Sequence, residues 1–155
     1  MKINNRRYIG CKTKLLGFID ETVSSYPVSK FKTFADIFAG TGVVANHFAE
    51  KGYKTIVNDL LFSNVVVYKA LLGDGKIRTD LLKKEIDSFN KLNGSELKDN
   101  YFSNVYGGKY FSVNDAKCIG FIRDKIEESK NKYSEREYCY LIASLLYACD
   151  RTANT

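Results

Sequence analysis

Residues 33–59 read TFADIFAGTGVVANHFAEKGYKTIVND, and this stretch decides the fold. Residues 33–39 form a short apolar run that stops at the Gly-Thr-Gly of residues 40–42, which predicts a buried strand entering a tight turn. A helix is expected over 43–51, ended by the glycine that follows, and a second strand over 54–58. The stretch therefore predicts a strand–turn–helix–strand unit, the front of a parallel α/β sheet whose strands are buried on both faces.

Outside this stretch the apolar spacing is helical, and no further convincing strand is found. Asn114 is expected to cap one helix, and Ser134 and Glu137 have the spacing of a capping box at the start of another. Residues 93–112 are expected to form a loop. Helices are predicted over 12–25, 62–72, 79–92, 114–130 and 134–149. The expected fold class is α/β, with few parallel strands followed by a helical region.

The composition is that of a globular protein. The chain has 155 residues, of which 45% are hydrophobic and 27% charged, and no apolar run approaches the roughly 20 residues of a membrane helix. No secretory signal is visible, so a cytoplasmic protein is expected. His47 is the only histidine, and no metal-ligand spacing links the cysteines, which argues against a zinc site. The four cysteines are Cys11, Cys118, Cys139 and Cys149.

The net charge of +6 is unevenly distributed along the chain. Most of the excess lies in the first quarter, where Asp20 and Glu21 are the only acids before residue 36. A basic stretch of this kind suits a phosphate-rich partner, although a solvated surface would also explain it. The basic residues of this quarter are Lys2, Arg6, Arg7, Lys12, Lys14, Lys30 and Lys32.

The glycines of the turn point to an adenosine-bearing ligand. Gly40 and Gly42 let a ligand approach the backbone closely, because glycine has no Cβ. Asp59 follows the second strand 19 positions after Gly40, where an acid can accept hydrogen bonds from the two ribose hydroxyls. The same glycines also fit the G-x-G-x-x-A pattern of nicotinamide cofactors, and a plain tight turn would use glycines too.

Two charged residues favour a methionine-containing ligand. Asp36 lies inside the first strand, and a buried carboxylate is costly unless it is paired, so a cationic group such as the α-ammonium of a methionine moiety is expected nearby. A hydroxyl or backbone partner is the alternative. Lys12 ends the RYIGCK segment upstream of the first strand, a segment surplus to a dinucleotide-binding fold, and it suits a methionine carboxylate.

The order RYIGCK, DIFAGTG and VND resembles the D12 class of N6-adenine DNA methyltransferases, and the likeness extends into the helical region. The resemblance implies S-adenosylmethionine as cofactor, double-stranded DNA as partner and a place in a bacterial, phage or plasmid restriction-modification system. It implies a cofactor-binding part over residues 1–75 and, over 76–155, a helical region where relatives place DNA-recognition elements. The cofactor-binding residues that it implies are Tyr8, Lys12, Asp36, Phe38, Gly40, Gly42 and Asp59.

The catalytic element of the family, Asp-Pro-Pro-Tyr or a close variant, does not occur in this chain, whose only proline is Pro27. No catalytic residue is therefore predicted here. The base pocket is expected to come from the remainder of a longer parent chain or from a second chain. Aromatic and lysine side chains of residues 100–111 are candidates for DNA contact, with a partly buried aromatic loop as the alternative.

Two other functions remain open at this point. A nicotinamide-dependent oxidoreductase domain would use the glycines and Asp59, but it needs more strands and leaves RYIGCK unexplained. A non-catalytic DNA-binding module derived from a methyltransferase would differ only in having no partner that supplies the catalytic motif.

Overall fold

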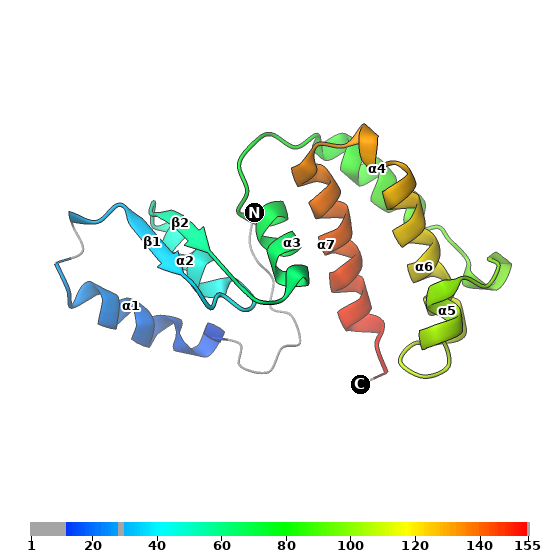
Figure 1. Cartoon of the computed structure of the whole chain (residues 1–155), viewed down its shortest axis with the longest axis horizontal. Coiled ribbons are helices and arrows are strands. Elements are labelled where there is room, and N and C mark those ends of the chain that lie inside the picture. The colour runs from blue at the N-terminus through cyan, green and yellow to red at the C-terminus, as the bar shows by residue number, and fades with distance from the viewer. Residues whose placement is uncertain (1–11, 28–29, 155) are drawn as a thin grey trace. The chain divides into compact units, whose positions relative to one another are not determined.

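The computed structural model describes residues 12–27 and 30–154. They belong to two compact units, Met1–Leu72 and Gly73–Thr155 (Figure 1). Each unit has its own hydrophobic core. The predicted fold class, an α/β part with few parallel strands followed by a helical region, is confirmed.

The first unit contains the predicted strand–helix–strand arrangement. Its two strands pair in parallel, with Thr33 opposite Lys54 and Asp36 opposite Val57. A 3-10 helix and a helix precede the strands, which confirms the helical pattern of residues 12–25. The elements are η1 (Lys12–Leu15), α1 (Leu16–Ser24), β1 (Thr33–Asp36), α2 (Val43–Glu50), β2 (Lys54–Val57) and α3 (Phe62–Leu71).

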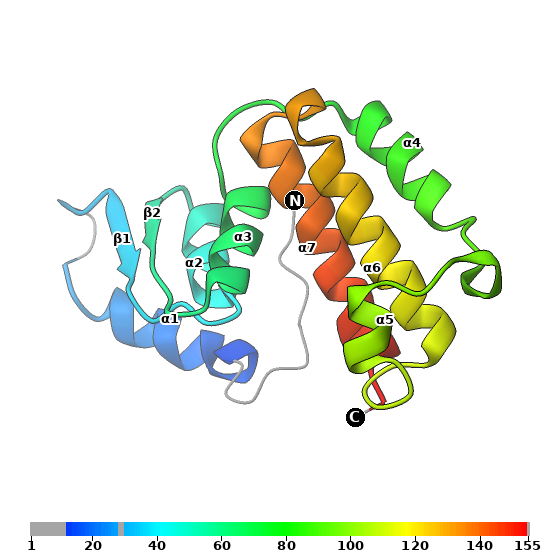
Figure 2. The same ribbon diagram turned by 45° about the vertical axis from the view of Figure 1, so that its right-hand side comes forward.

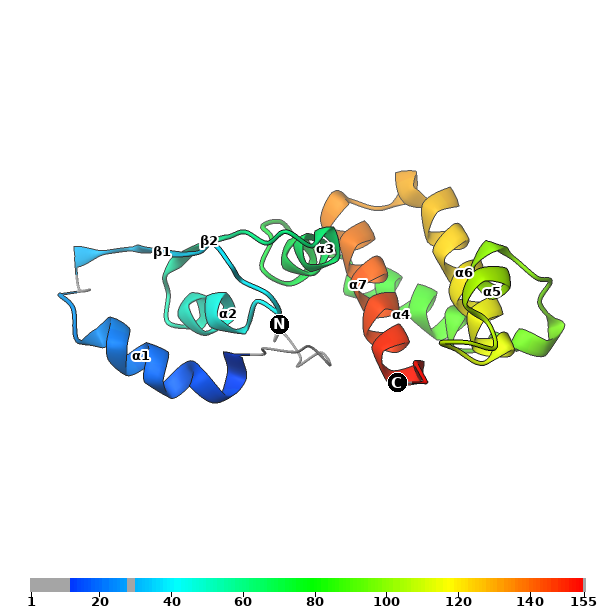
Figure 3. The same ribbon diagram turned by 60° about the horizontal axis from the view of Figure 1, so that its bottom comes forward.

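Helices α1 and α2 lie on the same side of the sheet (Figure 3). Their core centres on Phe48, whose ring stacks on Phe34 of β1 at 3.9 Å between centroids. Leu16 and Ile19 of α1 pack against the same cluster. The apolar spacing of α1 and α2 is therefore explained by a single shared core on one face of the sheet.

The strands differ from the prediction in two respects. β1 ends at Asp36 rather than at residue 39, because the chain turns there and Ile37 is exposed. The expectation that both strands are buried on two faces is wrong for the described chain. Side chains alternate along β2, and Ile56 on the face away from α2 is exposed. A sheet with helices on one side only leaves its other face uncovered.

The second unit is helical, and Figure 2 shows α6 and α7 side by side with α5 against α6. None of the helices in the described part of the chain is long and apolar enough to cross a membrane. Leu82, Ile126 and Leu141 form one buried cluster, contributed by three different helices. The elements are α4 (Thr79–Phe89), η3 (Gly94–Glu96), α5 (Tyr101–Tyr106), α6 (Val113–Glu128), η4 (Lys130–Lys132) and α7 (Glu135–Thr152).

Two predictions for the second unit are corrected. Residues 93–112 are not all loop, because α5 forms there behind an Asn100 cap whose Oδ1 accepts from the Ser103 N–H at 3.0 Å. Six residues are too few to leave a helical period in the sequence. The cap of α6 is Ser112 rather than Asn114, since the Ser112 hydroxyl accepts from the Asp115 N–H at 3.1 Å.

The predicted capping box of α7 is confirmed, and its Glu137 also forms an ion pair with Arg78 in which only the carboxylate is buried. Ser134 and Glu137 exchange hydrogen bonds between side chain and backbone. The Glu137 carboxylate, 2% exposed, also accepts from the Arg78 backbone N–H at 2.8 Å and from the Arg78 guanidinium at 2.6 and 2.9 Å. These donors, the guanidinium first, hold the pKa of Glu137 far below its usual range.

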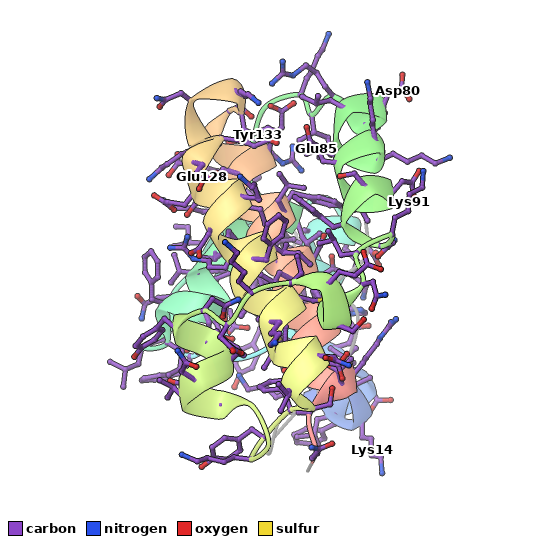
Figure 4. All side chains as sticks on the ribbon, turned by 90° about the vertical axis from the view of Figure 1, so that its right-hand side faces the viewer. Lys14, Asp80, Glu85, Lys91, Glu128 and Tyr133 are labelled. Carbon is purple, nitrogen blue, oxygen red and sulfur yellow. The ribbon has the colours of Figure 1, made fainter. Side chains whose placement is uncertain are left out.

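A second contact lies beside this ion pair. Glu85 of α4 and Tyr133, which precedes α7, have neighbouring side chains in Figure 4. Burial raises the pKa of the Tyr133 hydroxyl, and the Glu85 carboxylate raises it further. The second unit is thus held by paired polar groups as well as by apolar packing.

Candidate cofactor-binding site

The candidate site lies at the carboxyl ends of the two parallel strands. The chain leaves β1 through a turn in which Gly40 has φ 56° and Gly42 has φ 79°. These left-handed conformations favour glycine, and Gly42 caps the start of α2. The Ala39 N–H donates to the Asn58 carbonyl at 3.0 Å, so the turn is attached to the end of β2.

Asp59 connects three parts of this region. Its Oδ2 accepts from the Gly40 N–H at 2.7 Å. Its Oδ1 accepts from the Leu61 N–H at 2.9 Å and from the Asn64 amide at 3.0 Å. Partial burial acts to raise the pKa of Asp59, but the hydrogen bonds from Leu61, Asn64 and Gly40 outweigh it and lower the pKa below its ordinary value. The structure therefore favours a negative charge beside the glycine turn.

Lys12 and Asp36 lie next to each other, although 24 positions separate them in the sequence. The Lys12 Nζ is 3.8 Å from the Asp36 Oδ1 and donates a hydrogen bond of 2.5 Å to the Phe38 carbonyl. Asp36 is 8% exposed, and its Oδ2 accepts no hydrogen bond from any residue that the structure describes. A buried carboxylate oxygen with unused acceptor capacity fits a cationic ligand group.

Two buried side chains of α3 support the site, and the sequence did not reveal them as site residues. The Asn64 amide donates to Asp59, and the Tyr68 hydroxyl donates to the Gly40 carbonyl. Both residues are 3% exposed. A polar Asn within the apolar run FSNVVVYKAL was the available signal, because a buried amide needs a partner.

The remaining predicted site residues are distributed as follows. Tyr8 lies outside the described residues, as does most of the RYIGCK segment. The side chain of Phe38 is 77% exposed, and only its carbonyl contacts Lys12. Among the predicted residues that are described, Lys12, Asp36, Gly40 and Asp59 are brought together with the Gly42 cap of α2.

The aromatic segment of residues 100–111, in the second unit, is divided between core and surface. Phe111 is buried, and Phe102 and Tyr106 of α5 pack against its cluster, so these three aromatic side chains belong to the core, as the alternative to DNA contact expected, although two of them lie on a helix rather than in a loop. Tyr101 and Tyr110 are exposed, and Lys109 next to Tyr110 is exposed as well. The surface-facing members of the segment are therefore fewer than the sequence suggested.

Positive charge is concentrated in the first unit. Residues 1–72 contain ten Lys and Arg against five Asp and Glu, whereas residues 73–155 contain fourteen against thirteen. Lys14 projects outward from η1 in Figure 4, and Lys30 and Lys32 are also exposed. The second unit is close to neutral. Asp80 on α4 and Lys91, two residues after the end of α4, both project outward in Figure 4.

Comparison with known families identifies this arrangement. The family model of D12 class N6 adenine-specific DNA methyltransferases matches residues 8–155. The chain belongs to this family. The match covers both units, so the helical region is part of the family's sequence pattern as well as the glycine turn and Asp59. Between the cofactor classes that the glycine pattern left open, membership favours a methyltransferase over an oxidoreductase.

Several restriction-modification methylases are similar to the chain. It is 35% identical to the modification methylase StsI of Streptococcus sanguinis, matching 96% of this chain and 24% of that protein. It is 32% identical to the type II methyltransferase M.CviAII of Paramecium bursaria Chlorella virus 1, matching 99% and 48%. The modification methylase LlaI of Lactococcus lactis is 36% identical, matching 96% and 26%. The chain thus spans a quarter to half of these relatives. No solved structure matches it.

Proposed function

We propose that this chain forms the S-adenosylmethionine-binding part of a site-specific DNA adenine N6-methyltransferase of the restriction-modification type. The proposal combines family membership with the geometry at the ends of β1 and β2. The observation that carries it is the Lys12–Asp36 pair beside the glycine turn. The pair offers one cation and one buried anion 3.8 Å apart. It lies beside the turn in which Gly40 and Gly42 have left-handed backbone conformations.

This pair fits the amino-acid end of the cofactor. The methionine moiety carries an α-ammonium and an α-carboxylate on the same carbon, so it needs a negative and a positive partner close together. The unused Oδ2 of Asp36 can accept from the ammonium, and Lys12 can release the Phe38 carbonyl to bind the carboxylate. A nicotinamide dinucleotide has no such zwitterion.

The other end of the site fits an adenosine. Asp59 stays ionised at neutral pH and is fixed at the end of β2, where it can accept a ribose hydroxyl. Gly40 and Gly42 leave the backbone of the turn accessible to the ligand. When bound, the cofactor supplies a methyl group activated on a sulfonium, and the residues of this chain hold and orient it.

Methyl transfer needs groups that this chain does not contain. The proposal is that an Asp-Pro-Pro-Tyr element, on the remainder of a longer protein or on a second chain, holds the flipped-out adenine. Double-stranded DNA is the proposed partner, and Tyr101, Lys109 and Tyr110 are the exposed members of residues 100–111 that can contact it.

The test is calorimetric titration of the chain with S-adenosylmethionine, with NADH as the competing cofactor class. We expect S-adenosylmethionine to bind and NADH not to bind. Asp59→Ala removes the ribose acceptor and releases the turn, so binding should weaken about 100-fold or more, as expected when several hydrogen bonds to a charged group are lost together. Binding of NADH in preference, or unchanged affinity in the variant, would overturn the proposal.

A further inference from the structure

The carboxylate of Asp59 is largely occupied before any ligand arrives. A carboxylate offers about four acceptor positions, two on each oxygen. Both positions of Oδ1 are used, by the Leu61 N–H at 2.9 Å and the Asn64 amide at 3.0 Å. Oδ2 accepts from the Gly40 N–H at 2.7 Å, which leaves it one position with respect to the described residues.

The carboxylate cannot easily turn to offer more. Its two oxygens are tied to different segments, Oδ2 to the glycine turn after β1 and Oδ1 to the first turn of α3. Gly40 is also held at its carbonyl by the Tyr68 hydroxyl. Capping the start of α3 needs only one carboxylate oxygen, Oδ1. The additional bond from Gly40 to Oδ2 therefore fixes the orientation of the whole carboxylate.

We propose that Asp59 accepts a single ribose hydroxyl of the cofactor, through the remaining position on Oδ2, and that Asn64 is the positioning residue that imposes this. The inference rests on the proposed function and refines it. An acid that accepts from both ribose hydroxyls was expected from the sequence; the hydrogen bonds from Leu61 and Asn64 leave no acceptor on Oδ1 for the second hydroxyl.

The contact to Asn64 carries the inference because it is buried and specific. Asn64 is 3% exposed on a mostly apolar helix, and its amide reaches five positions back to Asp59. Without that amide, Oδ1 would keep one acceptor position free. The loss of Asn64 is therefore expected to change which hydroxyls Asp59 recognises, beyond any change in the stability of α3.

The experiment compares S-adenosylhomocysteine, used as a stable probe, with its 2′-deoxy and 3′-deoxy analogues by calorimetric titration. With the unchanged chain, one analogue should bind roughly 10- to 100-fold more weakly than the parent, the effect of one lost hydrogen bond to a charged group. The other should bind within about threefold of the parent, because its missing hydroxyl has no acceptor on Asp59.

Asn64→Leu replaces the amide by an apolar group of similar size. With Oδ1 partly free, Asp59 can accept from both hydroxyls, so the two analogues should differ by less than about threefold. Val66→Ala is the matched control, because Val66 is buried on the same helix and has no polar contact to the site. It should destabilise α3 while leaving the difference between the analogues unchanged.

The outcomes separate this inference from the proposed function. If the parent binds and both analogues weaken equally, Asp59 accepts from both hydroxyls and the inference is wrong, while the proposed function stands. If the two analogues still differ in affinity for Asn64→Leu as they do for the unchanged chain, Asn64 is not the positioning residue. If S-adenosylhomocysteine and S-adenosylmethionine both fail to bind, the proposed function fails, and the inference with it.

Discussion

Each of the two units buries one carboxylate almost completely, and the two carboxylates differ in how many of their oxygens accept hydrogen bonds. Glu137 in the second unit accepts hydrogen bonds from Arg78 and from the Ser134 N–H, so both of its oxygens are used. Asp36 in the first unit has Lys12 at 3.8 Å, and its Oδ2 accepts no hydrogen bond from the described residues. Burial alone therefore does not distinguish the two acids. We propose that the unused acceptor capacity of Asp36 marks it as the ligand-binding one.

The same contrast holds for the surroundings of the two acids. Glu137 forms the capping box of α7 with Ser134 and also accepts hydrogen bonds from Arg78, which precedes α4. Its charge therefore stabilises the fold. Asp36 lies at the end of a strand, beside a glycine turn whose neighbours Ile37 and Phe38 are exposed.

Removal of the charge at Glu137 is expected to have the largest effect. Glu137→Gln keeps the size of the side chain but weakens the hydrogen bonds from Arg78. It also places the NH2 group of the new amide, a donor, next to the N–H donors that now bind the carboxylate. We expect the free energy of unfolding to fall by about 2–3 kcal/mol, the range for a broken buried ion pair whose partner can still reach water. Urea denaturation measures it.

The control for this change is Glu128→Gln, since Glu128 forms an exposed pair with Lys125 three positions away on α6. An exposed pair contributes only a few tenths of a kcal/mol, so this variant should unfold like the parent. Equal losses in both variants would contradict the structural role assigned to Glu137.

Asp36→Asn should separate stability from binding. The variant removes a buried charge with an unpartnered oxygen, so the free energy of unfolding should change by less than about 1 kcal/mol or increase. Affinity for S-adenosylmethionine should fall roughly 10- to 100-fold, because the ammonium loses its anionic partner. Denaturation and calorimetry on the same sample test both parts. An Asp36→Asn variant that is clearly destabilised yet binds S-adenosylmethionine normally would show that Asp36, like Glu137, serves stability rather than binding.

Two helical glycines extend the comparison from charge to packing. A Cβ at Gly120 of α6 would lie 2.1 Å from the Asn100 Oδ1, the atom that caps α5. Gly120→Ala should therefore lower the free energy of unfolding by about 1–2 kcal/mol. At Gly17 of α1 nothing lies within 4 Å, so Gly17→Ala should raise it by about 0.5–1 kcal/mol. Thermal unfolding of the two variants should shift in opposite directions; a shift in the same direction would contradict the packing described.

The smallest expected effect is that of pH on Asp59. Its pKa is lowered in the folded chain, so its contribution to stability is complete above its unfolded value of 3.8 and declines only as the pH falls through the lower folded value. Affinity for S-adenosylmethionine should therefore be unaffected by Asp59 between about pH 5 and pH 8. Calorimetry across this range tests the point, and a tenfold loss that disappears in Asp59→Asn would contradict it.

Most of the fold could be predicted because it depends on local patterns. The apolar spacing of α1 and α7, and the capping box of Ser134 and Glu137, are visible within one or two helical turns. α5 was missed because its cap, Asn100, introduces only six helical residues. The uncovered face of the sheet could not be predicted, because it depends on which elements pack there.

The geometry of the candidate site was partly predictable for the same reason. Gly40, Gly42 and Asp59 belong to a short motif with a fixed spacing, and Lys12 and Asp36 carry charges where few are expected. The support from Asn64 and Tyr68 depends on how α3 packs against the turn, a tertiary contact without a local pattern. Of the occupied acceptors of Asp59, the one used by Asn64 follows from the same packing.

The most direct test of the central claim compares S-adenosylmethionine with 5′-methylthioadenosine, which shares the adenosine but lacks the amino-acid end. If the Lys12–Asp36 pair binds the zwitterion, S-adenosylmethionine should bind about 100-fold more tightly in calorimetric titration, and Asp36→Asn should remove most of that difference. Equal affinities for the two compounds would show that the pair does not recognise the amino-acid group, and the assignment of this site to S-adenosylmethionine would be wrong.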